Sequence, residues 1–113
     1  MRKIIVLAAV SAALLAGNTT AQAADAKKGR EVYVEKGCWS CHGYEGQGGV
    51  AGPRLSHTEL PVDAFASFVH DTNGTMPPYS KKLVSDEQLA DVHAFLLSLP
   101  KPLDAKTIPL LNP

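Results

Sequence analysis

The pattern of apolar and polar positions along the chain predicts three short helices. The first runs from Asp25, whose side chain is a suitable N-cap, to about Glu35, and Gly37 suits the left-handed position that ends a helix. Glycine inside a helix costs about 0.5–1 kcal/mol relative to alanine, so Gly29 predicts close approach by another element. Tyr33, one turn further on, extends the same face.

The second helix is predicted after a proline. Pro61 suits the first helical position, and Phe65, Phe68 and Val69 follow at three- and four-residue spacing. The Asp-Thr-Asn-Gly sequence at residues 71–74 ends this helix with turn chemistry. A β-hairpin at its Asn-Gly pair is the alternative, but the flanking segments lack the alternation of strands.

The third helix carries the clearest local signals. Ser85 and Gln88 form a capping-box pattern at its start, and Pro100 ends it. Apolar residues repeat along one face between them, with Phe95 beside that face: Leu89, Val92, Leu96 and Leu99. The remaining residues, 101–113, contain three prolines and are expected to form an extended tail.

The segment Cys38-Trp39-Ser40-Cys41-His42 has the spacing of the C-x-x-C-H motif that attaches c-type haem. Each thiol can add to one vinyl group of a porphyrin, and His42 then becomes the proximal ligand of the iron. A redox dithiol is one alternative, but no β-branched strand precedes Cys38. Structural zinc is another, but it needs about four Cys or His ligands, and the chain has no further cysteine.

Residues 1–24 are expected to be a cleaved signal peptide. Arg2 and Lys3 precede the apolar run 4–16, and Ala21-Gln22-Ala23 resembles a cleavage signal, which predicts cleavage near Ala23 or Ala24. A membrane anchor is the alternative, but the run is shorter than the roughly 20 residues that span a bilayer. We therefore expect export to the periplasm and no stable membrane insertion after cleavage.

Cleavage would leave 89 residues, a small domain of the kind that usually needs a covalent or metal staple. The loss of Arg2 and Lys3 would reduce the 11 basic residues to 9, against 11 acidic residues, so the net charge would be −2. That charge argues against nucleic acid as a partner.

From Asp25 to Pro100 the chain resembles small monohaem class I cytochromes c. The residues that carry the resemblance are Gly29, Tyr33, the C-x-x-C-H motif with Gly43, Gly52-Pro53-Arg54-Leu55, Gly74-Thr75-Met76-Pro77-Pro78-Tyr79, Leu89 and Phe95-Leu96. The resemblance implies an all-α fold in which three main short helices wrap around one covalently attached haem c. It makes residues 25–100 the haem domain and packs the first helix on the last, with Gly29 opposite Phe95.

The resemblance also implies that the Met76 sulfur is the sixth ligand of the iron, opposite His42. If the signal peptide is removed, Met76 is the only methionine left, and the alternative is that it simply fills the core. The prolines that follow it predict a stiff loop that could hold the sulfur on the iron. His57, His70 and His93 are rival ligands, each in a position typical of a solvated or core-edge imidazole.

Further pocket residues follow from the same resemblance. The Pro53 carbonyl should accept a hydrogen bond from Nδ1 of His42, and Leu55 should pack on the porphyrin. Arg54 and Tyr79 could each bind a haem propionate or face solvent. Trp39 would either cover the haem edge or fill the surface between the cysteines.

The function implied is electron transfer rather than catalysis. With both axial positions filled, no substrate reaches the iron, and the haem would carry single electrons from a dehydrogenase or respiratory-chain donor to a haem or copper acceptor. One alternative is a dedicated cytochrome subunit of a periplasmic dehydrogenase complex, the electron-accepting subunit of an oxidoreductase. A haem enzyme or gas sensor with a labile sixth ligand is another. The apolar residues 108–111 of the tail could dock on a partner, but we expect them to strap across their own domain.

Overall fold

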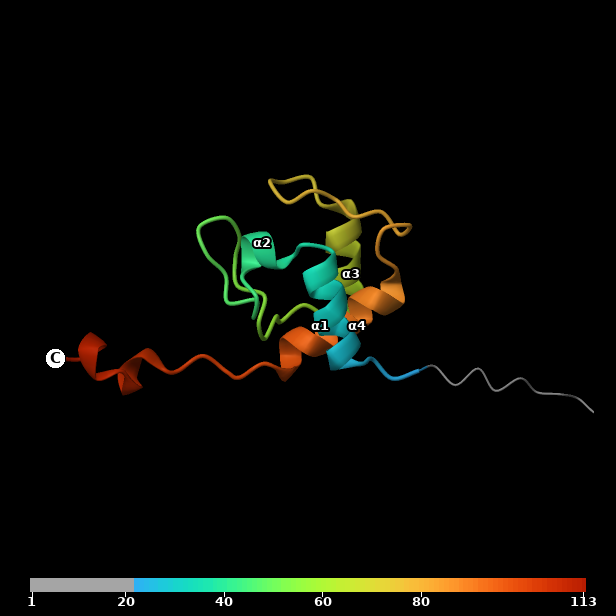
Figure 1. The fold of residues 1–113 in the computed structure, drawn as a ribbon. Coiled ribbons are helices and arrows are strands. Elements are labelled where there is room, and N and C mark those ends of the chain that lie inside the picture. The colour runs from blue at the N-terminus through green and yellow to red at the C-terminus, as the bar shows by residue number, and fades with distance from the viewer. Residues whose placement is uncertain (1–21) are drawn as a thin grey trace, which may run out of the picture.

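Helices α1 (Ala26–Glu35) and α4 (Asp86–Ser98) cross at the centre of the domain, and α3 (Val62–Asp71) packs on α4 (Figure 1). A one-turn helix, α2 (Trp39–His42), follows α1. The computed structural model describes residues 22–113, so nearly all of the expected signal peptide lies outside the described residues. This described part of the chain contains helices and loops but no strand, which confirms the predicted all-α fold.

The helix ends follow the local signals in the sequence. The Asp25 carboxylate accepts hydrogen bonds from the N–H groups of Lys27 and Lys28, at 2.8 and 3.2 Å. Gly37, with a φ of 76°, follows α1 in the left-handed conformation that glycine adopts without strain. Both halves of the capping box are present at α4, and Pro61 is the N-cap of α3 rather than its first residue.

The core lies where α1, α3 and α4 meet. Its buried apolar residues are Val32, Tyr33, Phe65, Ala66, Val69, Val84, Leu89, Val92, Phe95 and Leu96. The expected pairing of Gly29 with Phe95 is wrong, because Gly29 lies against the main chain of Asp91 and Val92, about one turn earlier in α4. The Phe95 ring instead packs on Tyr33, with ring centroids 5.4 Å apart.

Phe68 differs from the other apolar positions of α3. Its spacing predicts burial beside Phe65 and Val69, yet 56% of its surface is exposed. Phe68 lines a large cavity on this side of the domain. The apolar residues of α3 therefore face either the core or the cavity.

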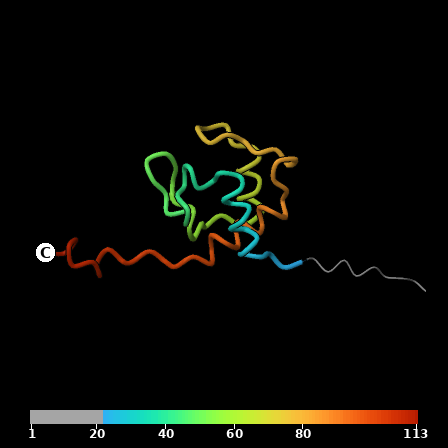
Figure 2. Tube along the Cα trace, in the orientation of Figure 1, coloured from blue at the N-terminus to red at the C-terminus, as the bar shows by residue number. Residues whose placement is uncertain are grey.

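The C-terminal tail runs away from the domain (Figure 2). It contains two 3-10 turns, η1 (Ala105–Thr107) and η2 (Pro109–Leu111), held by hydrogen bonds within the tail itself. Leu103, Leu110 and Leu111 are exposed, so the expectation that the tail straps across the domain is wrong. Among the described helices, none has the length and apolarity needed to cross a bilayer.

Candidate functional site

Helix α2 shapes the C-x-x-C-H motif into a single turn. The N–H of His42 donates to the Cys38 carbonyl at 3.1 Å, and the Ser40 hydroxyl donates to the Gly37 carbonyl at 2.7 Å. Cys38 and Cys41 are three residues apart on this turn, a spacing that brings side chains to the same side. Apolar periodicity did not predict α2, because four residues are too few to show a period.

The His42 imidazole is held by a main-chain carbonyl. Only 6% of the residue is exposed, and Nδ1 donates to the Pro53 carbonyl oxygen at 2.7 Å, which is the contact that the resemblance implied. Because Nδ1 carries the proton, Nε2 keeps the lone pair that a metal requires. Gly52 makes the approach possible, since a Cβ there would lie 2.9 Å from Nδ1.

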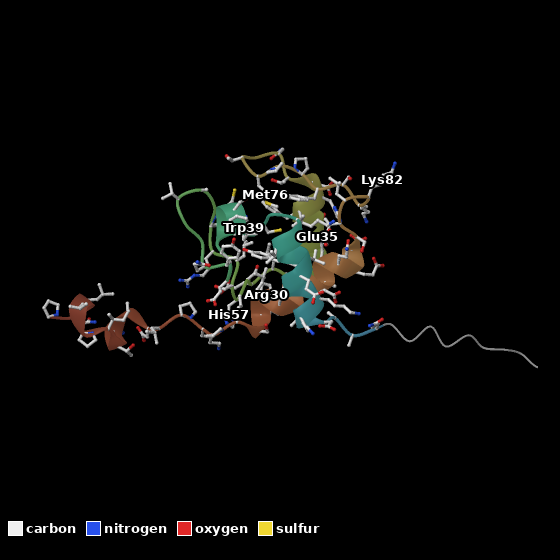
Figure 3. The ribbon with its side chains drawn as sticks, in the orientation of Figure 1. Arg30, Glu35, Trp39, His57, Met76 and Lys82 are labelled. Carbon is white, nitrogen blue, oxygen red and sulfur yellow. The ribbon has the colours of Figure 1, made fainter. Side chains whose placement is uncertain are left out.

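The motif opens onto a cavity of about 1020 Å³. This volume reaches the upper end of the roughly 300–1,000 Å³ that small-molecule sites occupy. All the site residues predicted from the sequence line it: Cys38, Cys41, His42, Pro53, Arg54, Leu55, Met76 and Tyr79. Met76, half-buried, comes from the loop between α3 and α4, so the cavity joins two segments that are far apart in the sequence (Figure 3).

The remaining polar candidates differ in their partners. The Tyr79 hydroxyl donates its one proton to the Lys36 carbonyl at 3.1 Å, so that proton is not available to a propionate. Arg54 is exposed at the cavity, and its guanidinium makes no hydrogen bond within residues 22–113. Trp39 stacks on Tyr44, with centroids 4.6 Å apart, and does not line the cavity.

Each of the rival histidines has a ring nitrogen within hydrogen-bond distance of a main-chain carbonyl. A ring nitrogen of His57 lies 2.6 Å from the Leu99 oxygen, and one of His93 lies 2.8 Å from the Leu60 oxygen. His70 contacts both the Tyr79 carbonyl and the Asp86 carboxylate. None of the three histidines lines the cavity. Their hydrogen bonds to carbonyl oxygens give each of them a role in the structure other than binding iron.

The thiol pKa and the grouping of possible metal ligands bear on the two alternatives to haem, a redox dithiol and a structural zinc site. Burial raises the pKa of the Cys38 thiol, whereas redox-active dithiols have lowered thiol pKa values. Among the described residues, no cluster of three or more His, Cys, Asp or Glu could hold a metal ion by itself. A thiol pair, an imidazole with a free Nε2 and a thioether on one apolar cavity fit haem c.

The chain is similar in sequence to known cytochrome c proteins. Residues 24–96 match the sequence model of a family described as cytochrome c oxidase, cbb3-type, subunit III. The chain is also 38% identical, over 69 residues, to the menaquinol:cytochrome c reductase cytochrome c subunit of Bacillus subtilis (strain 168). That match covers 61% of this chain but only 27% of the relative. No solved structure matches the chain.

Proposed function

Because the chain belongs to the family of cytochrome c domains described as cytochrome c oxidase, cbb3-type, subunit III, we propose that it carries single electrons through one covalently bound haem c with His42 and Met76 as axial ligands. Haem c supplies one-electron exchange between Fe(III) and Fe(II). The observation that supports this proposal most strongly is that His42 and Met76, 34 positions apart in the sequence, line one cavity.

Each site residue has a separate part in the proposal. Cys38 and Cys41 hold the cofactor as thioethers, and Nε2 of His42 binds the iron while the Pro53 carbonyl fixes the ring through Nδ1. Met76 occupies the sixth position and raises the potential by favouring Fe(II). Leu55 and Phe68 supply apolar cavity wall, and Arg54 is the candidate donor to a propionate.

We propose that electrons enter from a dehydrogenase or respiratory-chain donor and leave to another haem or copper protein in the periplasm. The relative's name makes it the cytochrome c subunit of a reductase, which supports respiratory partners of this kind. Redox partners typically share transient interfaces below about 1,200 Å². The exposed tail keeps a second version open, in which the chain is the dedicated cytochrome subunit of one dehydrogenase complex. Co-purification of the native protein with a stable partner would favour that version over a free carrier.

Met76→Ala tests the ligand assignment. Loss of the sulfur should lower the reduction potential and allow the ferrous protein to bind CO, because the sixth position opens. Asn73→Ala is the matched control, since Asn73 is exposed in the same loop and does not line the cavity. An unchanged potential without CO binding in Met76→Ala would show that another group binds the iron.

A further inference from the structure

The loop that carries Met76 is tied back to the helix from which it departs. This segment, residues 72–78, is called the Met76 loop below. The N–H of Tyr79, which follows it, donates to the Val69 carbonyl at 3.0 Å, and the Tyr79 carbonyl accepts from Nδ1 of His70 at 2.5 Å. One residue is thus held through both of its main-chain polar groups by the last turn of α3.

The chain between this anchor and Met76 has little freedom. Pro77 and Pro78 are the two intervening residues, and each has a fixed φ and no N–H group. The Tyr79 hydroxyl adds a third attachment, to the Lys36 carbonyl at the end of α1. The position of Tyr79 therefore determines where the Met76 sulfur can lie.

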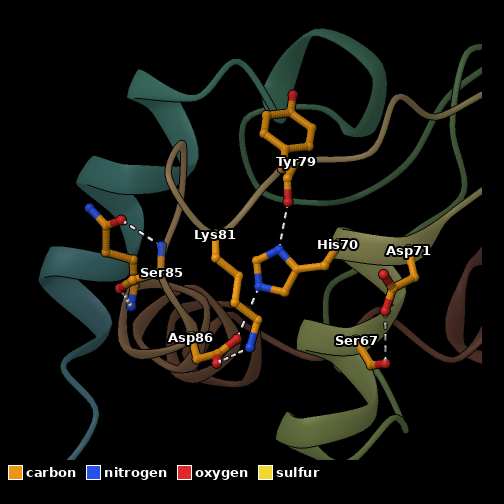
Figure 4. A network of polar contacts seen from close by, with 8 residues as sticks. Ser67, His70, Asp71, Tyr79, Lys81, Ser85 and Asp86 are labelled. Atoms are coloured by element: carbon orange, nitrogen blue, oxygen red, sulfur yellow. Dashed lines mark hydrogen bonds and ion pairs between the residues drawn. The ribbon is translucent and has the colours of Figure 1, made fainter.

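His70 is itself fixed from its other side. Its side chain is 7% exposed, and Nε2 lies 3.0 Å from Oδ1 of Asp86, the first residue of α4. Oδ2 of the same carboxylate pairs with Nζ of Lys81 at 2.6 Å (Figure 4). The hydrogen bond from Lys81, and then that from His70, lowers the pKa of Asp86 and keeps its carboxylate ionised. The two oxygens that face His70, the Tyr79 carbonyl and Oδ1 of Asp86, are both hydrogen-bond acceptors.

We propose that His70 is a positioning residue for Met76: it joins the last turn of α3 to the Tyr79 carbonyl and to Asp86, and so holds the Met76 loop at the cavity. This inference rests on the proposed function, in which Met76 binds the iron. In many metal sites an outer-shell residue orients a metal ligand without touching the metal, and His70 would act on Met76 in this way.

A matched set of substitutions in the haem-loaded protein tests the proposal. His70→Leu removes the donor to Tyr79, whereas His70→Asn keeps an N–H donor at the position of Nδ1. His93→Leu is the control, because His93 also bonds a main-chain carbonyl, that of Leu60, outside the Met76 loop. The readouts are the near-infrared sulfur-to-iron band, the CO-binding rate of the ferrous protein and hydrogen exchange of the Tyr79 amide.

His70→Leu should weaken the band, raise the CO-binding rate by roughly 10–100-fold, the range typical of outer-shell substitutions, and speed exchange of the Tyr79 amide. His70→Asn should restore most of each property, and His93→Leu should leave all three unchanged. Equal behaviour of His70→Leu and His93→Leu would overturn the proposal.

A second pair covers the case in which His70→Leu does not form holoprotein. Asp86→Ala removes the partner of Nε2 but leaves the hydrogen bond from His70 to Tyr79. It should shift the three readouts in the same direction as His70→Leu, but by a smaller amount. Glu87→Ala, its control, removes the adjacent carboxylate of α4 and should not shift them; equal effects of the two would refute the role of His70.

If Met76→Ala itself fails to open the iron, the ligand assignment fails as well. If it opens the iron and the His70 variants do nothing, only the positioning role fails.

Discussion

Gly29 in α1 lies so close to Asp91 in α4 that no side chain fits between the two helices. A Cβ on Gly29 would stand 1.9 Å from the carbonyl oxygen of Asp91 and 2.7 Å from the nitrogen of Val92. The Asp91 carboxylate also accepts a hydrogen bond from the N–H of Asp25, at 2.7 Å, where α1 begins. This crossing fixes the two helices against each other, and α1 leads directly into the C-x-x-C-H turn.

Gly29→Ala should therefore destabilise the protein although alanine is the better helix former. The methyl group meets main-chain atoms that cannot rotate away, so the free energy of unfolding should fall by about 1–3 kcal/mol or more. Gly49→Ala is the control, because a Cβ there would meet no atom within 4 Å, and its effect should stay within about 0.5 kcal/mol. Denaturant unfolding of both variants checks this, and equal stability would contradict the tight crossing.

The sequence predicted the helix boundaries well because their signals are local. Asp25 caps α1 and Ser85 caps α4 through hydrogen bonds that span only a few residues, so side-chain chemistry alone locates those ends. The partner of Gly29 could not be located to the residue, because a crossing point depends on how two distant helices rotate and slide.

Sequence reasoning was least informative where apolar residues face something other than the core. Phe68 has the spacing of a core residue but lies on the cavity wall. The spacing of apolar residues does not distinguish a side chain buried in the core from one that lines a cavity. The apolar tail was expected to cover the domain because chain termini are commonly anchored on it, yet Leu110 is 93% exposed. Of the predicted cavity residues, Cys38, Cys41 and His42 came from the spacing of the C-x-x-C-H motif, and the others came from the resemblance to class I cytochromes c.

Alkaline pH should destabilise the protein through buried tyrosine. The Tyr33 ring is fully buried and its hydroxyl donates to the Gly43 carbonyl at 2.7 Å. Burial raises the pKa of Tyr33 far above its ordinary value, and burial also raises the pKa of Tyr79. An unfolded tyrosine ionises near pH 10, so this stabilisation is complete below about pH 10 and falls as the pH rises further.

Tyr33→Phe should reveal this contribution. The variant should lose about 1–3 kcal/mol at neutral pH, because the Gly43 carbonyl loses its donor, and its stability should fall less steeply above about pH 10. Tyr44→Phe, a change at an exposed tyrosine, should keep the slope of the wild type. Urea unfolding between pH 7 and about 11 measures both effects, and parallel slopes for all three proteins would contradict the prediction.

Deletion of residues 104–113 should leave the melting temperature unchanged. The leucines of the tail are exposed, and the hydrogen bonds of its two turns form within the tail, so the domain loses no contact. Circular dichroism on heating tests this, and a clear fall in melting temperature would restore the self-strap.

The same truncation separates the two versions of the partnership. If the tail docks on a dedicated partner, reduction by the physiological dehydrogenase should slow while reduction by a small artificial donor stays constant, because only the first needs the lost contact area. If the dehydrogenase reduces the truncated and the full-length protein at the same rate, a freely diffusing carrier is favoured.

Removal of the cysteines should show how far folding depends on the cofactor. Cys38→Ala or Cys41→Ala alone should weaken attachment, and the double variant should yield little folded holoprotein, because the apolar cavity would then lack its covalently held occupant. Haem content after acidic acetone extraction and far-ultraviolet circular dichroism measure this. A stable, helical double variant without haem would contradict the structural role of the cofactor.

The absorption spectrum of the oxidised holoprotein is the sharpest test of whether His42 and Met76 both bind the iron, because it reports both axial positions at once. We predict low-spin ferric haem with the near-infrared sulfur-to-iron band, which requires the Met76 sulfur on the iron opposite an imidazole. High-spin ferric haem without that band would contradict it and would indicate an enzyme or gas sensor with an open sixth position.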